Sequence, residues 1–137
     1  MEDTRYGMRV ELPVAYEDAI ERTTAALKTE GFGVLTTIDV KQTIKQKLDR
    51  DFRKYVILGA CNPPIAFQAL SAELELGLLL PCNLVVYETD PGRSVVAAVA
   101  PLVTMGRVDN EALAPLGQQV DAKLRRVLAT LETGDTR

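Results

Sequence analysis

Apolar and polar positions along this chain repeat with two different periods, and these periods predict its elements. Residues 8–12 alternate apolar and charged side chains, which is typical of a strand with one buried face. Residues 15–30 instead repeat their apolar-face positions every three or four residues, as an amphipathic helix does. These positions are Tyr16, Ile20, Thr24 and Leu27.

Two units follow, each a strand and then a short helix. The first has a strand rich in Val and Thr at residues 33–38, and Asp39 is the expected N-cap of a helix that ends near Asp49. The second has a continuous apolar run at residues 55–60, typical of a strand buried on both faces. Asn62 is the expected N-cap of the short helix after it.

The C-terminal part predicts a hairpin and a second long helix. Strands are expected at residues 84–87 and 95–100, and Pro91 followed by Gly92 favours a type II turn between them. The long helix is expected to start at Pro115. Its apolar stripe is Leu116, Val120, Leu124, Val127 and Leu131.

This order predicts an α+β fold in which two long helices cover one face of an antiparallel-rich, five-stranded sheet, with two short helical insertions. The length of 137 residues suits a single domain spanning residues 1–137. We expect its core to cover about residues 8–131. Residues 1–7 and 134–137 are expected to be loose tails.

Composition and charge narrow the classes of function. Apolar residues make up 47% of the chain, enough for a packed core, and the net charge of −3 argues against a nucleic-acid partner. No apolar run approaches the ~20 residues of a membrane-spanning helix, and the polar start of the chain leads into no apolar run. We therefore expect a cytoplasmic protein with no signal peptide and no membrane partner.

Histidine is absent from the chain, which removes the usual general base near neutral pH and the commonest metal ligand. Catalysis by a serine–histidine or cysteine–histidine pair within one chain is therefore excluded. No glycine-rich phosphate-binding motif is present, and we expect no cofactor and no resident metal.

The candidate site lies in two short segments, Cys61-Asn62 and Pro81-Cys82-Asn83, which hold both cysteines. Cys61 directly precedes a predicted helix start, where a thiolate would face unpaired N–H groups and the positive end of the helix dipole. Cys82 precedes a strand, so the same argument does not apply to it. The alternative interpretation is structural: each cysteine is a small buried apolar residue, and each asparagine caps a helix or forms a turn.

Three further features are weaker candidates. Residues 40–54 carry six basic and two acidic side chains, a net charge of +4, which leaves −7 on the rest of the chain. An anionic partner or a solvated helix face would explain this. Glu73 and Glu75 are the nearest candidates for an acid or base in the sequence. The leucines of residues 74–80 exceed what one loop should expose, which favours a subunit contact there or on the outer sheet.

These features favour a non-enzymatic, homodimeric module that binds a small molecule or a protein near the two Cys-Asn segments. One alternative is a thiol enzyme or redox sensor, with Cys61 as nucleophile and Cys82 as resolving thiol. The other is metal binding by paired cysteines across a dimer, for which soft thiolates favour copper(I) or zinc.

Gly31-Phe32-Gly33, the run from Tyr55 to Pro63 and the run from Gly77 to Asn83 resemble the family called domain of unknown function 302. The resemblance covers about Met8 to Leu131. It implies a fold similar to half of the TATA-binding protein, with the order strand, helix, four strands, helix, and it implies a dimer. It also makes Cys61, Asn62, Pro81, Cys82 and Asn83 the expected shared site. No activity comes with the family, and the fold alone does not imply DNA binding.

Overall fold

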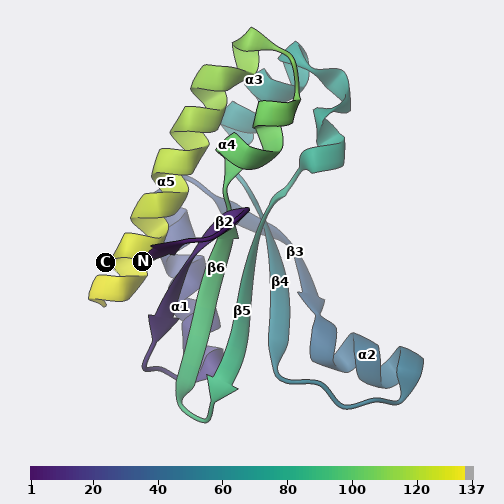
Figure 1. Cartoon of the computed structure of the whole chain (residues 1–137), viewed down its shortest axis with the longest axis vertical. Coiled ribbons are helices and arrows are strands. Elements are labelled where there is room, and N and C mark those ends of the chain that lie inside the picture. The colour runs from purple at the N-terminus through teal and green to yellow at the C-terminus, as the bar shows by residue number, and fades with distance from the viewer. Residues whose placement is uncertain (135–137) are drawn as a thin grey trace.

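The computed structural model describes residues 1–134, which form one antiparallel sheet with its long helices packed on one side (Figure 1). The strands are β1 (Glu2–Asp3), β2 (Gly7–Leu12), β3 (Gly33–Asp39), β4 (Tyr55–Cys61), β5 (Cys82–Asp90) and β6 (Arg93–Val99). The α-helices are α1 (Tyr16–Thr29), α2 (Val40–Leu48), α3 (Pro63–Ala72), α4 (Pro101–Thr104) and α5 (Ala114–Thr133). Short 3₁₀ segments are η1 (Leu74–Leu79), η2 (Met105–Arg107) and η3 (Glu111–Leu113).

The α+β class is confirmed, but the prediction of five strands is wrong: the sheet has six, in the order β1-β2-β6-β5-β4-β3. The extra strand comes from the predicted N-terminal tail. A turn closed by the hydrogen bond from Thr4 N to Gly7 O brings Glu2 and Asp3 back beside β2. They extend the sheet at an edge that would otherwise be unpaired.

The core lies between the sheet and the two long helices. Side chains alternate between the two faces of each strand, and the face toward the helices is apolar on β4, β5 and β6. Its buried members include Val56, Leu58, Leu84, Val86 and Val96. All five residues of the apolar stripe predicted for α5 are buried, which confirms that helix face. The face of α1 that is buried is made by Tyr16, Ala19, Thr23, Ala26 and Leu27.

Both short helices start where the sequence predicts. The Asp39 side chain accepts a hydrogen bond from Gln42 N at the start of α2, and Asn62 accepts one from Ile65 N at the start of α3. α3 packs between η1, η3 and α5, whereas α2 projects from the body and buries none of its residues (Figure 1). Among residues 1–134, no helix is both long and apolar enough to cross a bilayer.

The long helix α5 ends at Gly134, whose φ of 76° is the left-handed conformation that glycine adopts readily at a helix end. The predicted C-terminal tail begins at this residue. Residues 135–137 of that tail lie outside the described part of the chain.

Candidate functional site

The two Cys-Asn segments meet because β4 and β5 are antiparallel neighbours. Ala60 near the end of β4 pairs with Cys82 at the start of β5, so Cys61 lies one residue beyond this pair. The cysteines are 21 positions apart in sequence but share one end of the sheet. The helix α3 begins directly after β4 and covers this end.

A cavity of about 310 Å³ lies under α3 at this place. Four of the five predicted site residues line it, namely Cys61, Asn62, Pro81 and Cys82. The rest of its wall is apolar and comes from distant parts of the chain. These residues are Phe32, Leu35, Ala60, Ala66, Ala69, Leu70, Gly77, Leu80, Met105 and Val120. We call this cavity the cysteine pocket.

Asn62 has a structural task in this pocket. It accepts a hydrogen bond from Ile65 N at 3.4 Å, and its Nδ2 donates to the carbonyl oxygen of Glu30 at 3.3 Å. The first bond caps α3 and the second ties its start to the end of α1. Gly31, with a φ of 83°, lies close by, and a Cβ there would be 3.0 Å from Asn62 Nδ2. The amide is thus engaged by the fold, and it offers little hydrogen bonding to a ligand.

Pro81 reaches the pocket through a close approach to β4. A Cβ at Gly59 would lie 2.7 Å from Pro81 Cγ and would overlap the hydroxyl oxygen of Thr36. Glycine at this strand position therefore allows Pro81 and Thr36 to pack directly against the backbone.

The Cys82 thiol behaves as part of an apolar wall. Its side chain is buried, and burial, followed by the nearby charge of Cys61, raises its pKa to about 11. At neutral pH the thiol is therefore protonated and a poor nucleophile. Cys61 is half-buried at the end of β4. Within the described residues, no group of three or more histidine, cysteine or acidic side chains is placed to hold a metal ion.

Asn83, the fifth predicted site residue, lies on the other side of the sheet. Successive strand residues face opposite sides, so Asn83 points away from the neighbouring Cys82. It lines a groove of about 700 Å³ on the open face, together with the stacked rings of Tyr55 and Tyr87, whose centroids are 5.4 Å apart. The sequence-based grouping of Asn83 with Cys82 overlooked this alternation.

Other predicted features have structural explanations. Glu73 accepts a hydrogen bond from Asn110 Nδ2 at 3.1 Å, which links the end of α3 to the segment before η3. In the leucine-rich run, Leu76 is buried, whereas Leu74 and Leu78 are exposed. The pocket wall also contains Leu35, Met105 and Val120, which sequence reasoning missed. No sequence signal points to Met105, because residues 100–114 carry no regular apolar period.

Comparison with known proteins agrees with this architecture. The family model described as domain of unknown function DUF302 matches residues 8–131. The chain belongs to the DUF302 family. The crystal structure of an uncharacterized conserved DUF302 protein from Bacillus stearothermophilus is similar, with a TM-score of 0.84 and 31% sequence identity. The match covers 93% of this chain and 99% of that DUF302 chain. No curated protein matches the sequence.

Proposed function

We propose that this DUF302 domain is a binding module for a small apolar molecule, or for the apolar part of a larger one, held in the cysteine pocket. The observation that carries the proposal is the composition of the pocket wall. Ten of its fourteen residues lie outside the two Cys-Asn segments, and all ten have apolar side chains or none. The polar side chain of the wall, Asn62, is already bonded to the backbone.

The size and chemistry of the pocket set the class of ligand. About 310 Å³ accommodates a short acyl chain or two to three aromatic rings, at the lower end of small-molecule sites. No lining residue carries a charge, so a charged group buried inside would be without a partner. The ligand is therefore expected to be neutral where it enters the pocket.

The thiol chemistry considered from the sequence is less well supported. A resolving thiol must reach its thiolate form, and the raised pKa of Cys82 opposes that at neutral pH. Binding without catalysis needs no such group, because apolar contact alone stabilises the complex.

A neutral fluorescent probe tests the proposal. N-phenyl-1-naphthylamine is titrated into the protein, and saturable binding of one probe per chain is expected. Ala66→Phe places a ring from α3 in the pocket and should weaken binding at least ~10-fold. Gln68→Phe adds the same ring on the exposed side of α3 and should leave the affinity unchanged. Equal binding by wild type and Ala66→Phe would refute the proposed site.

A further inference from the structure

One end of the molecule exposes large apolar side chains. Phe67 on α3 and Leu74 and Leu78 on η1 are 74%, 85% and 84% exposed. α4 adds the exposed Leu102 and Val103. We call this end, formed by α3, η1, α4 and η3, the apical surface; it lies at the top of Figure 1. Apolar patches of this kind commonly mark contact sites.

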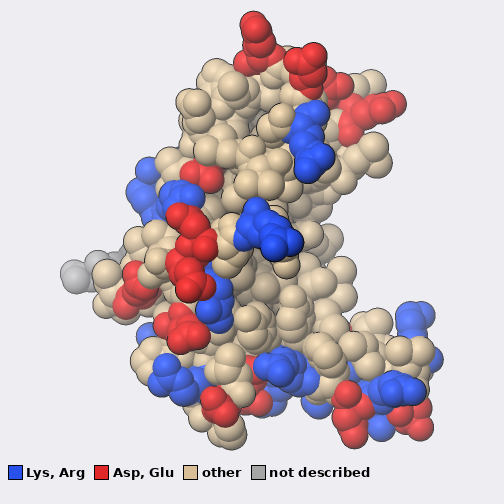
Figure 2. All heavy atoms as spheres, viewed as in Figure 1, with Lys and Arg blue, Asp and Glu red and all other residues tan. Residues whose placement is uncertain are grey.

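The apical surface is also acidic. Glu75, Asp109 and Glu111 are exposed there, and Figure 2 shows acidic side chains gathered over this end. The hydrogen bond between Asn110 and Glu73 keeps the segment before η3 against the end of α3. A partner for this surface is therefore expected to be apolar at its centre and basic around it.

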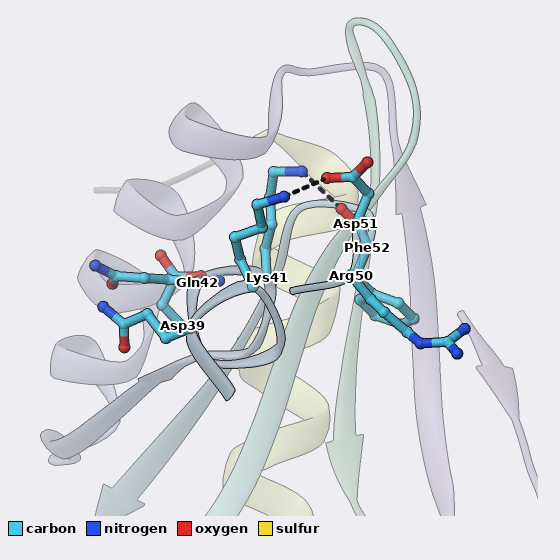
Figure 3. Close-up of a pocket in the computed structure, with 8 residues that line it drawn as sticks. Asp39, Lys41, Gln42, Arg50, Asp51 and Phe52 are labelled. Atoms are coloured by element: carbon cyan, nitrogen blue, oxygen red, sulfur yellow. Dashed lines mark hydrogen bonds and ion pairs between the residues drawn. The ribbon is translucent and has the colours of Figure 1, made fainter. Parts of the chain in front are cut away.

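Residues 40–54 have these complementary properties. This segment, which we call the arm, consists of α2 and the loop that returns to β4. Its net charge is +4, and it exposes two large apolar side chains, Leu48 at 65% and Phe52 at 41%. The loop is held to α2 because Lys41 Nζ donates to the carbonyl oxygen of Phe52 at 2.7 Å (Figure 3).

Two cations of the arm are free to meet a partner. The Arg50 side chain extends away from the helix in Figure 3. Neither Arg50 nor Lys47 makes an ion pair or side-chain hydrogen bond within the described part of the chain. By contrast, Lys45 is 3.1 Å from Asp49, so part of the arm's charge is already neutralised.

The arm and the apical surface stand at opposite ends of the same side of the molecule. Between them the outline is hollowed in Figure 2, alongside the strand β3. β3 is the last strand of the sheet, so one of its edges pairs with no other strand in the described residues. Leu35 and Ile38 on this strand are also exposed.

We propose that two copies of this chain associate about a twofold axis beside β3, so that the arm of each lies against the apical surface of the other. A rotation of 180° about this axis brings the arm of each copy to the apical surface of the other. The interface therefore contains the same arm-to-apical contact twice. Each contact joins an apolar, basic arm to an apolar, acidic surface. A second copy fits because one chain carries both halves of the complementary pair.

Charge-swap complementation tests this arrangement. The apical variant carries Glu75→Lys and Asp109→Lys, and the arm variant carries Lys47→Glu and Arg50→Glu. These four side chains are exposed, so the fold should persist. Alone, each variant brings like charges together in both contacts, and its dimer should dissociate about 100-fold more readily than the wild type. Mixed in equal amounts, the two variants restore opposite charges in both contacts and should form a mixed dimer.

The measurement is sedimentation equilibrium of each variant, of the mixture and of the wild type. A matched control, Lys28→Glu with Arg93→Glu, makes the same charge change as the arm variant at exposed positions away from both surfaces and should remain dimeric. The proposal is overturned by a wild type that is monomeric at about 100 μM, by variants that stay dimeric alone, or by a mixture that stays monomeric.

The association also bears on the cysteine pocket. Leu35 is an exposed residue of β3 and also lines the cysteine pocket, so a second copy beside β3 would lie close to the pocket mouth. The effect of the second copy on the pocket rests on the proposed function, whereas the proposed dimer itself does not. Sedimentation needs no ligand, and the Ala66→Phe titration needs no dimer, so the two proposals can fail separately.

Discussion

The two short helices, α2 and α3, begin with the same kind of cap but have different structural roles. Each follows a strand directly, and each begins with a polar residue whose side chain accepts a hydrogen bond from a backbone N–H of the first turn. α3 buries Ile65 and Ala69 and forms one wall of the cysteine pocket. No residue of α2 is fully buried, and α2 projects from the body as part of the arm.

The difference shows that capping sets where a helix begins, whereas packing determines what it can do. An isolated helix of this length is marginal in water. α3 gains its stability from contacts with η1, η3 and α5. The arm relies on exposed interactions such as the Lys41 bond to Phe52, which suits a segment that completes its packing on a partner.

The largest expected effect comes from shortening one apolar side chain on each helix. Ile65→Ala removes a side chain that is 7% exposed and should cost about 2–4 kcal/mol of unfolding free energy, because it leaves a cavity. Ile44→Ala on α2 should cost less than about 1 kcal/mol, because Ile44 is only partly buried. Urea unfolding of both variants measures the contrast. Similar losses would show that α2 is packed as firmly as α3.

The second effect is a dependence of stability on pH that arises in the packed region. The pKa of Cys82 is raised to about 11 in the folded protein, so folding favours the neutral thiol. This stability is fully present below the pKa of the unfolded thiol, near 8.5, and is lost as the pH rises toward 11. The loss should be on the order of 3 kcal/mol.

Urea unfolding of wild type and Cys82→Ala between pH 8 and pH 11 isolates this contribution. Cys82→Ala should show a shallower decline over this range, although tyrosines such as Tyr16 and Tyr55, whose pKa values burial also raises, contribute to both proteins. Parallel curves for the two proteins would mean that the Cys82 thiol is accessible to water.

Much of the fold follows from local pattern. The stripe of α5 and the caps at Asp39 and Asn62 were readable because each depends on residues within a few positions. The strand β1 was not, because it forms only when the chain turns back on β2. On α1 the pattern selected the larger Ile20 and Thr24. Ile20 is only partly buried against the core, and the helix also buries Ala19, Thr23 and Ala26, whose small side chains permit a close approach to the sheet.

The candidate site was likewise predictable only in part from the sequence. The proximity of Cys61 and Cys82 follows from the pairing of β4 with β5, and no local pattern in the sequence specifies which strands pair. The position of Asn83 depends on which residues of β5 face the helices, and the grouping of Asn83 with Cys82 did not take the two-residue period of a strand into account. The apolar stripe of α5 predicted that Val120 is buried but not that it lines the pocket, and Met105 reaches the pocket through tertiary packing that leaves no local signal.

The smallest expected effect is the difference in unfolding free energy between removing the cap of α3 and removing the cap of α2. Asn62→Ala removes the cap of α3 and the bond to the Glu30 carbonyl, and should cost about 1–2 kcal/mol of unfolding free energy. Asp39→Ala removes one exposed cap and should cost about 0.5–1 kcal/mol. Urea unfolding gives both values.

Replacing Asn62 or Asp39 with serine separates the two contributions that Asn62→Ala removes together, namely the cap of α3 and the bond to Glu30. Serine keeps a capping oxygen but is too short to reach from position 62 to the Glu30 carbonyl. Asp39→Ser should therefore be nearly neutral, while Asn62→Ser should keep part of the loss seen for Asn62→Ala. If Asn62→Ser is as stable as wild type, the bond to Glu30 contributes nothing, and α3 is held by capping and apolar packing alone. A loss equal to that of Asn62→Ala would instead show that the link to α1 positions α3, and with it the wall of the cysteine pocket.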